Sequence, residues 1–192
     1  MPCPSARSRI LVSLPASAGQ LSSRPLGAIH IPSKAGMIMT VTIRLMRPGE
    51  ERTVSDLVVR VFTHDVGPLY APEGIAEFVG YASSVAISER QLHGHDVLVA
   101  TEENRIVGAL ELRDRAHVSL LFVDATDQRK GLGRLLVGEA LMMCRARHPA
   151  VAEVTANSSP NAVDAYMRYG FHAKGEAQVK NGITSIPMAL SL

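Results

Sequence analysis

Three short apolar segments follow one another almost directly in the middle of the chain, at 96–101, 106–112 and 117–123. Each has the length and composition typical of a β-strand, and polar turn residues separate them. Parallel neighbours need a crossover of a dozen or more residues, so consecutive strands joined this tightly must run antiparallel. The sequence therefore predicts an antiparallel meander, which excludes the βαβ unit of a dinucleotide-binding fold at this point.

Hydrophobic periodicity predicts helices and further strands on both sides of the meander. In the helix nearest before it, the apolar spacing puts Val79 and Val85 on the inward face. In chain order we expect a strand at 41–45, helices at 51–62 and 73–90, the meander, a helix that begins after Gly133 and ends before Pro149, a strand at 151–156, a helix that Ser159 caps and Gly170 ends, and two strands joined at Asn181-Gly182. This order, β-α-α-β-β-β-α-β-α-β-β, predicts a mixed α/β fold, with a central mixed sheet of the α+β type flanked by helices.

The first 38 residues differ in composition from the rest of the chain. They contain five prolines and no sustained helical or strand period, and no acidic residue precedes Glu50. We therefore expect a disordered or non-native extension over 1–38 and a single domain over 39–192. Three explanations stay open, in this order: a translation start assigned too far upstream, with Met37 or Met39 beginning the folded chain; an organellar transit peptide; and a secretory signal with an unusually short apolar run.

Charge and aromatic content narrow the classes of ligand. Of the 20 basic residues, 6 precede Glu50, so residues 50–192 carry 14 basic against 18 acidic residues, a net charge of −4 with neutral histidines. This balance slightly favours a cationic or amine-bearing substrate over a polyanion. With four Phe, four Tyr and no Trp, the chain offers few stacking platforms, so nucleic acid is not an expected partner.

Cysteine usage and hydropathy exclude further classes. Cys3 and Cys144 are the only cysteines, and neither has a second Cys or His at metal-ligand spacing, so we expect no disulfide framework and no metal site. No stretch approaches the roughly 18 consecutive apolar residues of a membrane span. The sequence therefore predicts a cytoplasmic protein without a membrane partner.

The loop after the meander, DQRKGLGRLL, places Arg129 and Lys130 before Gly131 and Gly133 at the start of a helix. Helix N-termini attract anions, because their first N–H groups are unpaired and the macrodipole is positive there. Two glycines would let a pyrophosphate approach the backbone without meeting a Cβ. A P-loop is excluded because no Lys-Ser or Lys-Thr pair follows the second glycine, and a dinucleotide fingerprint because Leu136 replaces its third glycine. The loop is then either another anion cradle or a glycine turn before a core helix.

Two segments together resemble a known family. LFVD at 121–124 followed by QRKGLG at 128–133 resembles motif A of the GCN5-related N-acetyltransferases, Q/R-x-x-G-x-G/A after a central strand. NSSPNAVDAYMRYGF at 157–171 resembles the family's motif B, with an aromatic residue four positions before a terminal Gly-Phe. The resemblance extends over about residues 40–192 and includes the order of elements. It implies a sheet that splays between its fourth and fifth strands, 117–123 and 151–156, to admit acetyl-CoA.

The resemblance also implies which residues bind the cofactor. The N–H groups of 128–134 would hold the pyrophosphate, and the strand before them would offer its backbone to the pantetheine arm and the thioester carbonyl. The implied cofactor residues are Leu121, Phe122, Val123, Gln128, Arg129, Lys130, Gly131, Leu132, Gly133, Arg134 and Asn157. Asn157 has an alternative role as a cap of the following helix.

The implied chemistry is direct transfer of an acetyl group to a primary amine of a small molecule or a protein. Tyr166 stands at the family's general-acid tyrosine, with a packed core aromatic as the alternative. Glu111 and His117 flank the last turn of the meander and are candidate bases, or ordinary polar residues beside a turn. Residues 63–80 would line the acceptor pocket. A larger acyl donor, a homodimer and a non-catalytic CoA-sensing module with the same fold stay open.

Overall fold

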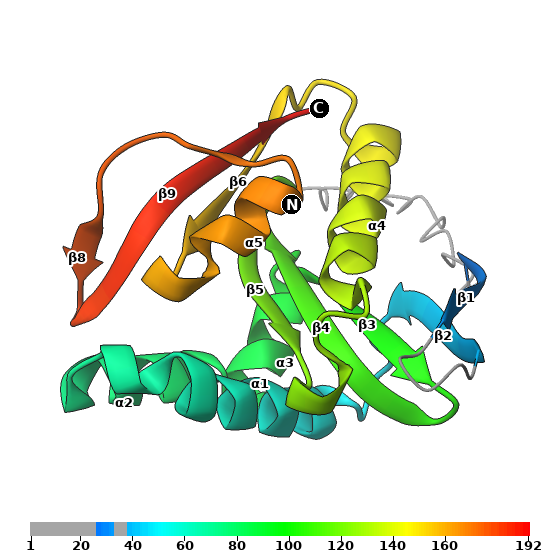
Figure 1. The fold of residues 1–192 in the computed structure, drawn as a ribbon, viewed down its shortest axis with the longest axis horizontal. Coiled ribbons are helices and arrows are strands. Elements are labelled where there is room, and N and C mark those ends of the chain that lie inside the picture. Colours follow the sequence, from blue (N-terminus) through cyan, green and yellow to red (C-terminus); the bar gives the residue numbers. More distant parts are fainter. Residues whose placement is uncertain (1–25, 33–37) are drawn as a thin grey trace, which may run out of the picture.

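The computed structural model describes residues 26–32 and 38–192 of the chain. A central sheet has helices on both faces, with α1 and α2 along one side and α4 and α5 on the other (Figure 1). The strands are β1 (Leu26–Pro32), β2 (Ile38–Leu45), β3 (Asp96–Glu102), β4 (Arg105–Arg113), β5 (His117–Val123), β6 (Glu153–Ser158), β7 (His172–Ala173), β8 (Gln178–Lys180) and β9 (Ile183–Ser191). The α-helices are α1 (Glu51–Asp65), α2 (Pro72–Tyr81), α3 (Ser84–Leu92), α4 (Leu132–Arg147) and α5 (Val163–Arg168).

The strands lie in the order β1-β2-β3-β4-β5-β6-β9-β7, and β8 pairs with β9. The predicted meander is confirmed, since β3, β4 and β5 pair antiparallel, with Leu110 opposite Leu98 on one side and Leu121 on the other. Strands β5 and β6 instead pair in parallel, with the chain crossing over through α4. The mixed α/β class that the sequence predicts is therefore confirmed.

Two hydrophobic cores cover the two faces of the sheet. On one face α1 and α3 pack on the meander, with Leu57, Ile87 and Leu120 buried among their neighbours. On the other face α4 and α5 pack on the sheet, with Leu136 and Tyr166 in the core. Strands β3 to β5 contribute side chains to both cores, so the centre of the sheet is covered on both faces.

The helix predicted over 73–90 is wrong in one respect, because the structure has two helices there. Ser83 interrupts the run: its hydroxyl accepts a hydrogen bond from the Ala86 N–H at 3.3 Å and caps α3. The helical phase restarts at this cap, so Ile87 is buried, whereas Val85 is 67% and Val79 37% exposed. The inward positions expected for these two valines are therefore incorrect.

Other differences lie at the ends of elements. Ser159 does not cap a helix, and its hydroxyl instead donates to Asn161 Oδ1 at 2.8 Å in a 3₁₀ turn, Pro160–Ala162, that precedes α5. Gly170 takes the predicted left-handed conformation, with φ of 101°. Asn181 and Gly182 also have positive φ angles, and they join β8 and β9 as predicted.

The expected extension over 1–38 lies mostly outside the described residues. Where the structure does describe it, the expected lack of regular structure does not hold, because β1 pairs antiparallel with β2. The apolar run and the proline-rich start, as well as Cys3 and Met37, lie outside the described part of the chain. Within the part that is described, no helix is long and apolar enough to cross a membrane.

The hairpin of β8 and β9 packs its turn directly against the start of α2. A Cβ added to Gly74 would lie within 2.8 Å of the Gly182 carbonyl carbon, so the two backbones touch at these glycines. Asn181 Nδ2 donates to Glu77 Oε1 at 3.1 Å, and the Tyr70 hydroxyl donates to the Thr184 carbonyl at 2.8 Å. The segment implied to line the acceptor pocket is thereby fixed to the last strand.

We expect Gly74→Ala to lower the free energy of unfolding by about 1–3 kcal/mol, because its Cβ would force the hairpin away from α2. Gly80→Ala is the matched control in the same helix, since no atom lies within 4 Å of an added Cβ there. It should be neutral or stabilise the protein by up to about 1 kcal/mol. Urea unfolding measures both, and equal effects of the two substitutions would contradict the contact.

Candidate functional site

A slot opens between β5 and β6, because the two strands pair at only two positions. His117 lies opposite Thr155 and Val118 opposite Ala156, after which β5 and β6 are no longer paired with each other. A β-bulge at Ser119 accompanies the separation, since Glu111 pairs with Leu120 and Leu112 with Val118. The β5 edge beyond Val118 therefore keeps N–H and C=O groups without a strand partner. The predicted splay is confirmed.

The N-terminus of α4 lies just beyond the open end of β5 and has no cap of its own. Gly131 is the N-cap residue, in the left-handed conformation with φ of 87°, and it offers no side chain to the first turn. The N–H groups of the first turn have no acceptor within the helix. Helix α3 differs, because the Ser83 hydroxyl accepts from its first turn. The start of α4 is therefore left open to an anion.

Asp127 holds the loop before α4 in place. Asp127 is 1% exposed, and its carboxylate accepts hydrogen bonds from Lys130 Nζ at 2.7 Å and Arg105 Nη2 at 2.8 Å. Burial raises the pKa of Asp127, but the hydrogen bonds from Lys130 and Arg105 outweigh burial and leave its pKa below the usual value. The Lys130 ammonium is thus engaged with Asp127 within the loop.

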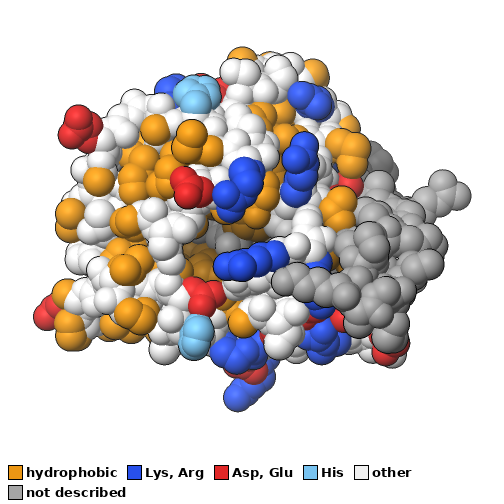
Figure 2. Space-filling view, viewed as in Figure 1, with side chains coloured by type: hydrophobic (Ala, Val, Ile, Leu, Met, Phe, Trp, Pro, Cys, Tyr) orange, Lys and Arg blue, Asp and Glu red, His pale blue; other side chains and the backbone are white. Residues whose placement is uncertain are grey.

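The remaining loop side chains divide into engaged and free groups. Gln128 Nε2 donates to the Val123 carbonyl at 3.2 Å and to Asp65 Oδ2 at 2.9 Å, so this amide is also occupied. Arg129 and Arg134 are exposed and make no hydrogen bond or ion pair within the described part of the chain. Lys and Arg side chains gather around a hollow near the middle of the face in Figure 2. The free guanidinium groups therefore supply the positive charge next to the α4 N-terminus.

The two loop glycines have different roles. Gly131 needs its positive φ, and an added Cβ would meet no atom within 4 Å. At Gly133 the space of a Cβ is already occupied by the Tyr169 hydroxyl group. The expectation that both glycines keep a Cβ away from a bound phosphate is therefore replaced at Gly133 by a packing requirement inside the protein. Leu132 between them is buried in the core.

Tyr166 combines the two roles that its sequence position left open. Its ring packs edge-on against Phe171 and Tyr169, at centroid distances of 5.3 and 6.2 Å. Its hydroxyl makes no hydrogen bond to any described residue. Burial, with a smaller contribution from Tyr169, raises the pKa of Tyr166 far above its usual range. The hydroxyl therefore stays protonated and available as a donor.

The structure does not leave Glu111 free to act as a base. Its side chain is fully buried and accepts two hydrogen bonds from Arg90, at 2.7 and 2.9 Å, and one from His95 Nδ1 at 2.8 Å. Arg90 also donates to the Tyr81 carbonyl and lies over its ring, 3.8 Å from the centroid. Glu111 therefore anchors α3 to the sheet, and no spacing in the sequence indicates its partners.

His117 is a weak base at the closed end of the slot. Its Nδ1 lies 2.8 Å from Thr155 Oγ1. Burial, helped by the nearby Arg113 charge and only partly opposed by Asp114, lowers the pKa of His117 to about 4. The imidazole is therefore neutral near pH 7, with a basicity poorly matched to removing a proton from an ammonium group.

Asn157 lies exposed near the end of β6, opposite Pro187 of β9. It makes no capping bond, because neither the 3₁₀ turn after β6 nor α5 has a side-chain cap. The capping alternative is therefore not observed. Asn157 directly follows Ala156, the last β6 residue that pairs with β5, so it belongs to the part of β6 that borders the slot.

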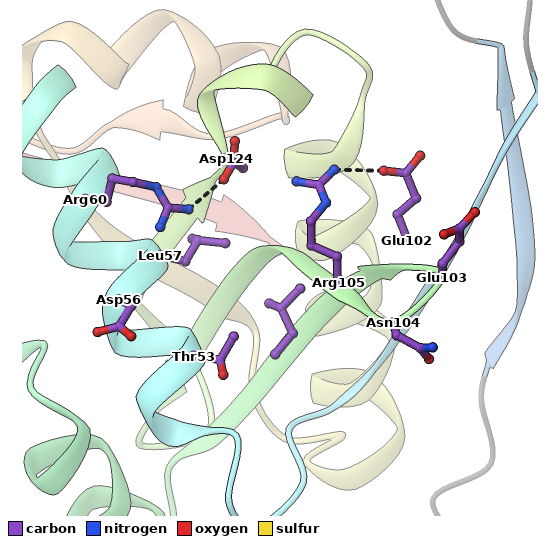
Figure 3. A pocket seen from close by; sticks show the side chains of 10 residues that line it. Thr53, Asp56, Leu57, Arg60, Glu102, Glu103, Asn104, Arg105 and Asp124 are labelled. Carbon is purple, nitrogen blue, oxygen red and sulfur yellow. Dashed lines mark hydrogen bonds and ion pairs between the residues drawn. The ribbon is translucent and has the colours of Figure 1, made fainter.

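A cavity of about 860 Å³ lies outside the slot, between α1 and the turn that joins β3 to β4 (Figure 3). It is lined by Thr53, Asp56, Leu57, Arg60, Glu102, Glu103, Asn104, Arg105, Ile106 and Asp124, none of which is an expected cofactor or catalytic residue. In residues 26–32 and 38–192, no group of three His, Cys, Asp or Glu residues is arranged to hold a metal ion. Cys144 is buried, and burial raises the pKa of its thiol.

Comparison with known proteins agrees with this architecture. The family model described as an acetyltransferase (GNAT) domain matches residues 66–192. A GCN5-related N-acetyltransferase from Rhodopseudomonas palustris is 22% identical, covers 81% of this chain and 99% of its own, and has a TM-score of 0.70. The PaiA N-acetyltransferase of Thermoplasma acidophilum, solved in complex with coenzyme A, is 14% identical. The match covers 80% of this chain and 100% of that protein, with a TM-score of 0.68. The apo form of YjaB from Escherichia coli is 26% identical, and the match covers 80% of this chain and 97% of that protein, with a TM-score of 0.59. No curated protein sequence gives a match.

We expect Asp127→Asn to destabilise the protein at pH 7 by about 1–3 kcal/mol, because Lys130 and Arg105 lose their charged acceptor. Since the folded pKa of Asp127 is lowered, its contribution is complete above the ordinary pKa of an unfolded aspartate and is lost as the pH falls through the folded pKa. The difference between variant and wild type should therefore shrink below about pH 4. Urea unfolding across pH 3–7 measures it, and Asp56→Asn, an exposed change on α1, should leave the free energy of unfolding at pH 7 nearly unchanged.

Proposed function

Because the chain belongs to the GNAT acetyltransferase family, we propose that it is an N-acetyltransferase that moves an acetyl group from acetyl-CoA directly to a primary amine. The observation that carries the proposal is the uncapped N-terminus of α4 at the open end of the slot between β5 and β6. An anion fits at the helix start, and an extended arm fits along the free edge of β5. A site with both parts suits the pyrophosphate and pantetheine of CoA.

The residues of the slot would divide the cofactor between them. The N–H groups of residues 132–134 and the free Arg129 and Arg134 would hold the pyrophosphate. The β5 backbone over 121–123 would pair with the pantetheine arm like an added strand, with the exposed Asn157 amide on the opposite wall. The coenzyme A in the Thermoplasma acidophilum relative supports the choice of this cofactor.

The chemistry we propose needs two kinds of donor. A β5 N–H directed at the thioester carbonyl would stabilise negative charge on its oxygen, an effect worth about 3 kcal/mol in other acyl-transfer enzymes. As the amine nitrogen bonds to the carbonyl carbon, the carbon–sulfur bond breaks and its electron pair goes to sulfur. The Tyr166 hydroxyl, kept protonated by burial, would donate to that sulfur. The amine loses one proton to water and Tyr166 regains one from water, so the net products are the amide and the free thiol.

Neither candidate base is suited to removing the proton of the amine. Glu111 is closed off by Arg90 and His95, and His117 is neutral and weakly basic. We therefore propose that the acceptor reacts as the neutral amine, its proton passing to water instead of to either side chain. The rate would then rise with pH until the pKa of the acceptor amine is passed.

The same observations favour one alternative, a module of the same fold that binds CoA without turnover. Release of free thiol from acetyl-CoA across a panel of small amines and peptide amines separates the two. Binding of CoA with no thiol release on any amine would favour the module. Competition between acetyl-CoA and longer acyl-CoA thioesters would reveal a larger acyl donor.

We expect CoA to raise the melting temperature of the wild-type protein. At 100 times its Kd, CoA should add about 2.7 kcal/mol to the free energy of unfolding. Gly131→Asp should abolish that shift, because it places a negative side chain at the anion site and strains a residue with positive φ. Gly138→Asp is the control, since it adds the same charge to α4 at a position where a Cβ meets nothing. It should keep the shift, and loss of the shift in both variants would contradict the assigned cradle.

We expect Tyr166→Phe to lower kcat by about 10²-fold while the Kd for CoA stays within about twofold, because only the donor to sulfur is lost. Tyr169→Phe is the matched control, since it removes the hydroxyl that lies against Gly133. It should keep most of the turnover. Steady-state kinetics and calorimetry measure both, and unchanged kcat in Tyr166→Phe would remove this residue from the mechanism.

A further inference from the structure

Asp65, the last residue of α1, contacts the segments that follow both walls of the slot, β5 and β6. Its Oδ2 accepts a hydrogen bond from Gln128 Nε2 at 2.9 Å. Its backbone carbonyl accepts one from Asn161 Nδ2 at 2.7 Å. Its other carboxylate oxygen lies 2.6 Å from His64 Nδ1. One residue therefore joins three segments that lie 63 and 96 positions apart along the chain.

These contacts lie where the two strands have no bonds to each other. The Gln128 amide also donates to the carbonyl of Val123, the last residue of β5, so this contact is fixed to the β5 end. Asn161 follows the end of β6 by three residues. Strand pairing between β5 and β6 stops at Val118 and Ala156. Asp65 is thus a bridge across the open end of the slot.

We infer that Asp65 is a positioning residue, which holds the β5 and β6 walls at a fixed separation and so prepares the slot for CoA. The inference rests on the proposed function, because it assigns the slot to CoA. A site that is ordered before binding loses less conformational freedom when the ligand enters. The bridge supplies this order from α1, an element outside the two sequence motifs.

The direction in which CoA affinity changes when Asp65 is replaced distinguishes a positioning role from a purely electrostatic one. Burial raises the pKa of Asp65, but hydrogen bonds from His64 and Gln128 outweigh burial, so the carboxylate is negative near pH 7. A negative charge beside the loop repels the phosphates of CoA. If only its charge mattered, removing Asp65 would tighten CoA binding. If Asp65 positions the slot, removing it weakens binding.

The experiment measures the Kd of CoA by calorimetry for a small set of variants of the full chain. Asp65→Ala should weaken binding by about threefold to tenfold, the range expected for one lost hydrogen bond. Asp65→Asn keeps an oxygen that accepts from Gln128, so it should bind as tightly as wild type or more tightly. Asp56→Ala, an exposed residue on the same helix with no described partner, removes the same charge and should not weaken binding.

A double-mutant cycle tests the contact itself. Gln128→Ala combined with Asp65→Ala should bind no more weakly than the weaker single variant, because both remove the same bond. Asn161→Ala cuts the other half of the bridge and should also weaken binding, which gives a second readout if Asp65→Ala unfolds. Urea unfolding of each variant separates loss of fold from loss of positioning.

Each outcome decides the inference. Equal or tighter binding of CoA by Asp65→Ala, or strictly additive effects in the cycle, would overturn the bridge while the proposed function stands. Failure of the wild-type protein to bind CoA would overturn the proposed function, and the inference with it. Weakened binding in Asp65→Ala and Asn161→Ala, restored in Asp65→Asn, is the expected result.

Discussion

The separation of β5 from β6 after two paired positions is the constraint on which the rest of the site depends. A strand edge in the middle of a sheet normally has all its backbone groups paired, and leaving them unpaired costs free energy. The fold holds β5 in place by other means, because its side chains pack into the α1–α3 core on one face and the α4–α5 core on the other. Antiparallel pairing with β4 fixes the opposite edge. The slot is therefore a product of packing on both faces of a strand that has lost one neighbour.

Most of the ionisable groups near this slot hold the structure together. Glu111 is buried with Arg90 and His95, and Asp127 with Lys130 and Arg105. A charge removed from water needs a partner of opposite charge and hydrogen bonds, so these carboxylates cannot also serve an exchanging substrate. The proposed site would instead attract an anion through the backbone N–H groups at the start of α4, with the free guanidinium groups of Arg129 and Arg134 beside them. Under the proposed function, recognition by backbone would explain why a residue without a side chain, Gly131, occupies the cap.

Much of the fold could be predicted from local sequence patterns, whereas contacts between residues distant in the sequence could not. The meander, the Gly170 helix end and the Asn181-Gly182 turn depend on residues within a few positions, and the structure has them as expected. The helix break at Ser83 was not predicted, because a serine inside an apolar period is a weak signal. Only the structure shows that its hydroxyl caps α3. Of the predicted cofactor loop, the sequence could indicate the glycines and the charges. It could not indicate that Lys130 is engaged with Asp127, or that Asp65 reaches Gln128, because tertiary packing decides such pairings.

The packing of Gly133 against Tyr169 links the two sequence motifs physically. Gly133 is in the first turn of α4, and the Tyr169 hydroxyl occupies the space that its Cβ would take. Tyr169 follows the last residue of α5, and its ring is edge-on to Tyr166, whose hydroxyl is the proposed donor. A larger residue at 133 would push Tyr169 away and shift Tyr166 with it, since interiors this closely packed transmit displacement. The glycine thus helps to set the distance between the proposed anion site on α4 and the proposed donor on α5, so a substitution there would affect the donor as well as the loop.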